Sequence, residues 1–173
     1  MGSHGGGTPE GQKEVLDSLN ITEERLGAKV VTCATCRSIG QTPDGLTAHM
    51  LDSAFSVDAI IPINRVKTHT SFKGCVESGM CKMLVVGLGG PGGAGQFHSL
   101  GQSELPRLLV DVSRIILQKM PVIGGIAIVE NAYEETARIQ ALLAEEMIER
   151  EVELLTWSKT LMPALPVDRL HGL

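Results

Sequence analysis

The spacing of apolar residues predicts helices near both ends of the chain and in its middle. Val15, Leu16 and Leu19 fall on one face of a helix. Thr8 followed by Pro9 supplies an N-cap residue and a proline suited to the first helical position. The expected helices cover residues 8–19, 22–27, 49–55, 103–119 and 145–161.

Short runs of β-branched and other apolar residues predict strands between these helices. They cover residues 28–33, 57–63, 122–129 and 136–142. Propensity alone would equally allow a helix in the last run, and we expect a strand because residues 131–135 resemble a hairpin connection. A Thr-Pro-Asp-Gly turn is expected at residues 42–45. This alternation predicts an α/β protein in which helices pack on a mixed sheet, with residues 1–173 forming one domain.

Residues 64–101 have a less regular pattern, with one expected helix at 77–86 and a glycine-rich run at 87–95. The run contains G-x-G-x-x-G spacing, but Pro91 occupies its fifth position and no acidic residue follows about 20 positions later. A phosphate-binding P-loop would also need Lys-Ser or Lys-Thr after the glycines, whereas Lys82 precedes them. We therefore expect a flexible loop whose backbone approaches a ligand.

The composition narrows the classes of function. A net charge of −5 and a pI near 5.5 give no electrostatic reason to expect nucleic acid. No apolar run approaches the ~20 residues that span a bilayer, and no secretion signal is recognisable. We therefore expect a cytoplasmic protein that interacts with neither nucleic acid nor membranes.

The four cysteines allow two interpretations. Cys33 and Cys36 have the C-x-x-C spacing of redox and zinc sites, whereas Cys75 and Cys81 fit no common zinc ribbon. Buried thiols are the simpler interpretation, because free cysteine behaves as a small hydrophobic residue. The alternative is a zinc or iron–sulfur site formed by all four cysteines.

Three histidines and one lysine are the candidate residues for a catalytic or cofactor-binding site. His4, His69 and His98 lie in glycine-flanked or polar contexts. Imidazole binds transition metals and titrates near neutral pH, so these residues are candidates for metal binding and for acid–base catalysis. Lys82 has apolar neighbours that could lower its pKa and free its amine for covalent attachment to a cofactor.

The segment that contains these residues resembles a known family. Asn64-Arg-Val-Lys-Thr-His-Thr-Ser-Phe-Lys-Gly, followed by Cys75-Val-Glu-Ser-Gly-Met-Cys-Lys-Met, is similar to the nickel-pincer lactate racemase family. It is closest to the racemase-like branch with an N-R-V-K-P-H-T…E-S-G-x-x-K-M core, although Thr68 stands at the proline position. The Gly-Ser-His-Gly-Gly-Gly-Thr opening and residues 129–137 resemble the same branch.

The resemblance implies a role for each candidate residue. Lys82 matches the lysine that tethers a pyridinium thioamide/thiocarboxylate mononucleotide, the nickel-pincer nucleotide, and His98 matches the histidine that completes the nickel coordination. His4 and His69 match the two acid–base histidines. The implied activity is racemisation or epimerisation of a small 2-hydroxy acid, such as lactate, by hydride transfer to the cofactor and back. The enzyme class implied is thus an isomerase.

The family chains are longer than this one. They include an upstream segment, with an arginine that helps to bind substrate and cofactor, and a second domain with further substrate-binding groups. We therefore expect the chain to correspond to the middle of a family member. The expected partners are a complementary domain or a second copy, because a sheet with uncovered apolar faces favours self-association. A further alternative is a non-catalytic binding or assembly module that keeps the family fold.

Overall fold

The computed structural model describes residues 4–163, so the two ends of the domain predicted at 1–173 lie outside the described residues. The α-helices are α1 (Pro9–Ser18), α2 (Glu23–Leu26), α3 (Met80–Lys82), α4 (Gly90–Ser99), α5 (Leu105–Lys119) and α6 (Met147–Leu161). A π-helix, η3 (Met83–Leu88), joins α3 to the turn before α4, and short 3-10 turns are η1 (His4–Gly7), η2 (Asp52–Ser56) and η4 (Ala144–Glu146). The strands are β1 (Cys36–Gln41), β2 (Thr47–Leu51), β3 (Ile63–Arg65), β4 (Gly124–Glu130) and β5 (Thr136–Leu143).

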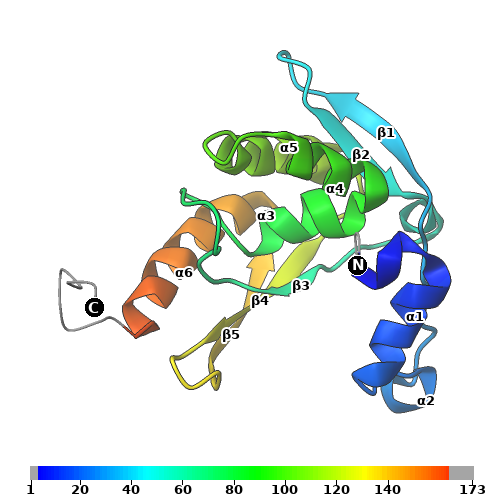
Figure 1. Ribbon diagram of the computed structural model, residues 1–173, viewed down its shortest axis with the longest axis horizontal. Coiled ribbons are helices and arrows are strands. Elements are labelled where there is room, and N and C mark those ends of the chain that lie inside the picture. The colour runs from blue at the N-terminus through cyan, green and yellow to red at the C-terminus, as the bar shows by residue number, and fades with distance from the viewer. Residues whose placement is uncertain (1–3, 164–173) are drawn as a thin grey trace, which may run out of the picture.

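The strands form two small sheets on different sides of the helices (Figure 1). Strands β1 and β2 form an antiparallel hairpin. In the second sheet β4 lies in the middle, parallel to β3 and antiparallel to β5. Helices packed against a partly parallel sheet confirm the predicted α/β class with a mixed sheet.

Helix α5 is the centre of the hydrophobic core. Leu108, Leu109, Val112 and Ile116 recur at helical spacing and are almost completely buried. The helix contacts β1 and β2 as well as α3 and η3. It therefore connects the β1–β2 hairpin to the segment that carries Lys82.

Cap residues define the first two helices as expected. The Thr8 side chain accepts a hydrogen bond from the Gly11 backbone N–H, and α1 starts at the next residue. The Thr22 side chain caps α2 in the same way, and Gly27 ends it in the left-handed conformation with a φ of 63°. The predicted helices at 103–119 and 145–161, the turn at 42–45 and the hairpin that ends in β5 are also present.

Three predicted elements are wrong or displaced. Residues 28–33 have the composition of a strand but pair with no strand in the described chain, and β1 begins at Cys36 instead. Residues 49–55 do not form one helix, because His49 pairs with Ser38 in the hairpin and only a 3-10 turn follows. The strand expected at 57–63 is reduced to one bridge at Ile60, and β3 starts where it should have ended.

The helices are too short for a membrane span. The longest, α5 and α6, have 15 residues each, whereas a span needs about 20 apolar residues. No helix within residues 4–163 combines the length and the apolar character required.

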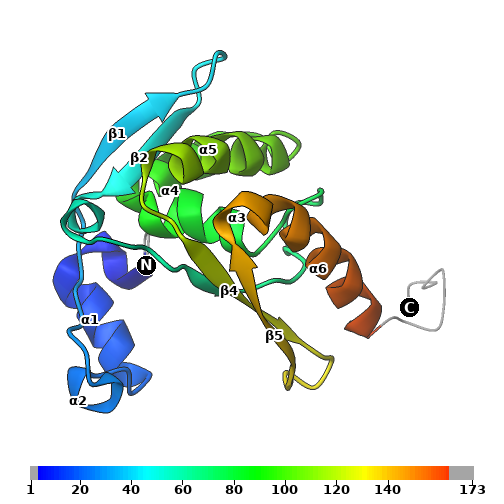
Figure 2. The same cartoon turned by 180° about the vertical axis from the view of Figure 1, so that it is seen from behind.

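One face of the three-stranded sheet is apolar and uncovered. Helices α3 and α6 pack against the sheet from one side, and Figure 2 shows no described helix over β4 and β5 on the other side. Ile63 and Ile139 are 53% and 65% exposed there, beside Ile126 and Ile128 on β4. This face is the part of the described structure to which the expectation of self-association applies.

We expect this face to mediate self-association of the chain. Light scattering should give a mass above the 18.4 kDa of a monomer, and Ile139→Lys should lower it, because a lysine cannot be buried there without a partner. Tyr133→Lys, at the tip of the β4–β5 hairpin, removes another exposed apolar side chain and serves as the control. A monomer at all concentrations would contradict the expectation.

Candidate functional site

One cavity brings together all four residues that the sequence singled out. It has a volume of about 360 Å³, which is within the range of small-molecule sites. Its lining consists of His4, His69, Ser71, Lys82, Val86, Phe97, His98, Leu100 and Leu105. Apolar walls with a few convergent polar groups are the usual composition of a ligand site.

The four candidate residues reach the cavity from separate elements. His4 lies in the 3-10 turn η1 that precedes α1, and His69 lies in the segment between β3 and α3. Lys82 is the last residue of α3, and His98 is in the last turn of α4. Their convergence therefore depends on tertiary structure and not on closeness in the sequence.

Lys82 is held in a partly apolar environment. Its side chain is half-buried, and its Nζ lies 5.4 Å from the centre of the Phe97 ring. Burial lowers the pKa of Lys82, and the nearby Lys67 ammonium lowers it further. A lower pKa increases the fraction of free amine at neutral pH, and the free amine is the nucleophilic form.

A π-helix follows Lys82 directly. The segment η3 runs from Met83 to Leu88, and π-helical turns occur often at functional sites. The glycine-rich run continues as helix α4, so the expected flexible loop is wrong. A Cβ at Gly89 or Gly93 would collide with the Val85 carbonyl oxygen, so these two glycines allow the π-helix and α4 to approach each other.

His69 is oriented by hydrogen bonds on its backbone and on its ring. Its backbone N–H donates to Oε2 of Glu77 at 2.7 Å, and its Nδ1 accepts from the Ser71 backbone N–H at 3.1 Å. A backbone N–H can only donate, so Nδ1 is unprotonated and the neutral ring carries its proton on Nε2. Partial burial lowers the pKa of His69, as do the Lys82 and Lys73 charges, against an opposing effect of Glu77.

Aromatic rings connect His69 with His98. The centres of the His69 and Phe72 rings are 4.4 Å apart, and Phe72 and Phe97 meet edge to face at 5.9 Å. The Phe97 ring lies 5.4 Å from the ring of its neighbour His98. The sequence analysis did not identify Phe72 and Phe97, although they are two of only three phenylalanines in the chain.

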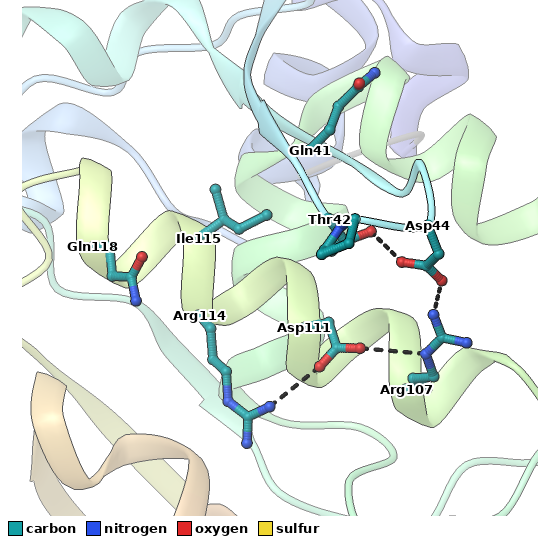
Figure 3. Close-up of a pocket in the computed structure, with 9 residues that line it drawn as sticks. Gln41, Thr42, Asp44, Arg107, Asp111, Arg114, Ile115 and Gln118 are labelled. Atoms are coloured by element: carbon teal, nitrogen blue, oxygen red, sulfur yellow. Dashed lines mark hydrogen bonds and ion pairs between the residues drawn. The ribbon is translucent and has the colours of Figure 1, made fainter.

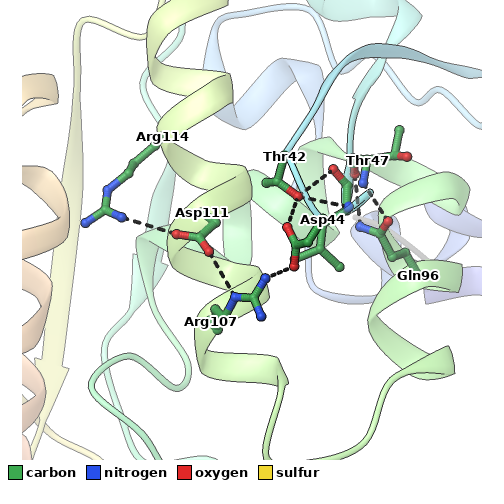
Figure 4. Close-up of polar contacts among 8 residues, drawn as sticks. Thr42, Asp44, Thr47, Gln96, Arg107, Asp111 and Arg114 are labelled. Atoms are coloured by element: carbon green, nitrogen blue, oxygen red, sulfur yellow. Dashed lines mark hydrogen bonds and ion pairs between the residues drawn. The ribbon is translucent and has the colours of Figure 1, made fainter.

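Helix α4 is fixed to the β1–β2 hairpin close to His98. The side-chain amide of Gln96 pairs with the Thr47 backbone, accepting from its N–H at 2.7 Å and donating to its carbonyl at 2.9 Å (Figure 4). Cys36 on β1 adds a second contact, because its Sγ accepts from the Gly92 backbone N–H. The position of His98 is therefore set by the hairpin.

A larger cavity of about 460 Å³ lies between the hairpin and α5 (Figure 3). Its charged groups neutralise one another, because Arg107 pairs with both Asp44 and Asp111, and Asp111 also accepts from Arg114. Within the described residues, the larger cavity is lined by neither histidine nor lysine, whereas the smaller cavity is lined by both. We take the smaller cavity as the candidate site.

The cysteines do not form the four-ligand site that the alternative interpretation requires. All four are free thiols; Cys81 is buried and Cys75 is exposed. Within residues 4–163, which include all four, no three His, Cys, Asp or Glu side chains are grouped so that they could bind one metal ion. Only Cys81 is a fully buried thiol, so the simpler interpretation holds for one residue of the four.

The residues of the smaller cavity fit a lysine-tethered cofactor whose metal needs a single protein ligand. The amine of Lys82 and the imidazole of His98 line the same cavity, and the rings of Phe97 and of neighbouring apolar residues form its walls. Such a cofactor would bring its own metal donors, so a cluster of protein ligands is not required.

Comparisons with protein-family models, with curated proteins and with solved structures found no match for this chain.

We predict that His69 titrates below its ordinary pKa of about 6.5 in an NMR titration. Lys82→Met should raise this pKa because it removes a nearby positive charge, whereas Lys13→Met, which alters an exposed pair on α1, should leave it unchanged. The unfolded chain binds the proton first as the pH falls. The contribution of His69 to stability is therefore complete above the unfolded pKa and is lost as the pH falls through the folded pKa.

Proposed function

We propose that this chain binds a nickel-pincer nucleotide through Lys82 and takes part in the racemisation or epimerisation of a small 2-hydroxy acid. The observation that carries the proposal is the convergence of His4, His69, Lys82 and His98 on one cavity. The resemblance concerns short sequence motifs, and the four residues come from separate parts of the fold.

Lys82 is suited to a covalent attachment. The tether in this class is a thioamide, so Lys82 would hold the cofactor through its Nζ, which must be unprotonated to form such a bond. Burial and the Lys67 charge both favour that unprotonated state. When bound, the cofactor supplies a metal-activated acceptor for the hydrogen on the α-carbon of the substrate.

His98 is suited to the remaining metal position. It lies on α4, which Gln96 holds against β2, so its approach to a ligand beside Lys82 is defined by the fold. Imidazole is a good ligand for nickel, so His98 would supply the protein ligand to the metal.

His69 is suited to hold a substrate oxygen by a hydrogen bond from Nε2. Because Nδ1 accepts from Ser71, the neutral ring presents Nε2–H as a donor to a substrate hydroxyl or carboxylate oxygen. Uptake of a proton would have to occur at Nδ1 and would break the Ser71 hydrogen bond, so His69 acts as a base only when that hydrogen bond is lost. His4 lines the same cavity, and the resemblance implies that it is the other histidine of the acid–base pair.

Positive charges around the cavity favour an anionic substrate. The charges of Lys67 and Lys73 act on Lys82 and His69, respectively, and lower the pKa of each. The same field attracts the carboxylate of a 2-hydroxy acid and the phosphate of a mononucleotide. The substrate class is thus consistent with the charges that surround the candidate site.

The decisive experiment measures the intact mass of the full chain after co-expression with the enzymes that make the cofactor. We expect an adduct on Lys82 together with bound nickel, and no adduct on Lys82→Arg, which keeps the positive charge but cannot form the thioamide. His98→Ala should keep the adduct and lose most of the nickel. An unmodified mass under all conditions, identical in pattern to Lys82→Arg, would refute the proposal.

A further inference from the structure

Helix α6 contacts the candidate site only from outside. The residues that line the cavity come from other elements, and α6 lies beside α3 (Figure 1). Two of its side chains nevertheless reach the segments that carry His69 and Lys82. These side chains are Lys159 and Glu151.

Lys159 acts on the His69 segment through a buried carboxylate. Glu77 is completely buried, and its Oε1 lies 2.9 Å from the Nζ of Lys159. The other oxygen, Oε2, accepts the backbone N–H of His69. Burial by itself would raise the pKa of Glu77, but hydrogen bonds from Lys159, His69 and Gly74 outweigh it and lower the pKa. The carboxylate is therefore charged and depends on these donors.

Lys73 supports the same arrangement from the solvent side. Its Nζ donates to the His69 carbonyl at 2.8 Å and lies 3.6 Å from Oε2 of Glu77. Lys73 is more exposed than Lys159, and its distance to the carboxylate is longer. Lys159 is therefore the principal counterion of Glu77, and it comes from a remote part of the chain.

Glu151 acts on the helical turn that carries Lys82. It is fully buried, and its Oε2 accepts the backbone N–H of Cys81, the residue before Lys82, at 2.7 Å. A Cβ at Gly79 would collide with the Glu151 carboxyl group, so the glycine allows this contact. Because Gly79 has an extended φ of 175°, the collision alone restricts this position.

We infer that α6 positions the candidate site, with Lys159 fixing His69 through Glu77 and Glu151 fixing Lys82 through Cys81. Lys159 and Glu151 are positioning residues and touch neither substrate nor cofactor. The catalytic consequence rests on the proposed function, but the geometric inference concerns the chain itself. Both can therefore be tested separately.

The first test uses Lys159→Met in the full chain without cofactor. The His69 amide donates to a charged group, and such hydrogen bonds are worth enough that their loss should speed exchange of this proton by at least about tenfold. NMR hydrogen exchange measures this, together with the ring nitrogen shifts that report the His69 tautomer. Lys159→Arg keeps the positive charge and should restore both signals.

The control for the first test is Arg150→Met on the same helix. Within residues 4–163, Arg150 pairs with Glu146 and Glu153 at the surface of α6 and forms no ion pair with the His69 segment. The inference is wrong if Lys159→Met leaves His69 exchange unchanged, or if Arg150→Met has the same effect. If Lys159→Met does not fold, Lys159→Gln replaces it, because glutamine keeps a hydrogen-bond donor without the charge. Lys159→Gln should show an intermediate increase in His69 amide exchange. Unchanged exchange in this variant would also overturn the inference.

The second test displaces Glu151 without removing it. Gly79→Ala should push the carboxyl group away from Cys81 and expose Lys82, so acetic anhydride labelling of Lys82 should reach half its maximum at a higher pH. Gly95→Ala is the matched control, because a Cβ there meets open space. Equal labelling profiles for both variants and the wild type would overturn the role of Glu151.

The loaded protein distinguishes this inference from the proposed function. If Lys82 carries the adduct, Lys159→Met should lower kcat more than it changes KM, because His69 is misplaced while the cofactor remains bound. If no adduct forms on the wild type, the proposed function fails, and the exchange and labelling experiments still decide whether α6 positions His69 and Lys82.

Discussion

A carboxylate removed from water must be neutralised or paired, and in this protein that requirement organises the chain around Glu77. The side chain is completely buried, and its oxygens gather a backbone N–H from each end of the loop between His69 and Gly74. The Lys159 ammonium completes the arrangement from the last helix. One buried charge thus joins the β3–α3 segment to a helix that lies far away in the sequence.

In the rest of the site, too, the candidate reactive residues differ from the residues that hold them in place. The candidate reactive side chains line the cavity, and most of the groups that hold them in position lie outside the cavity lining. Gln96 holds α4 against β2, Glu151 holds the first turn of α3, and Ser71 holds the His69 ring. Backbone groups make most of these contacts, so the geometry of the site is determined by main-chain positions as much as by the side chains that face the cavity.

Local sequence patterns predicted the elements whose signals are local. Thr8 and Thr22 identified helix starts because a cap acts within a few residues, and α5 was clear because burial follows its 3.6-residue period. The strand predicted at residues 28–33 is wrong because a strand requires a partner. The turn at 42–45 brings together the residues on either side of it, and these form the β1–β2 hairpin instead.

The site was predictable to a different extent. A resemblance in short motifs located His4, His69, Lys82 and His98, and the fold brings them to one cavity. Lys159 carried no signal, because its partner Glu77 is distant in the sequence and an exposed helix explains a lysine equally well. The glycine-rich run predicts a loop because glycine has a low helix propensity, but the close contacts that only glycine permits stabilise a helix there.

The π-helix also has a consequence for how such sites diverge. A π-helical turn is equivalent to an α-helix that has accepted one extra residue, and η3 occupies the stretch between Lys82 and His98. In a regular α-helix the deletion of one residue rotates every following side chain by about 100°, whereas a deletion within the π-helix removes the extra residue, restores α-helical winding and leaves the flanking residues in register. The number of residues between Lys82 and His98 can therefore change by one at the π-helix without rotating His98 away from Lys82.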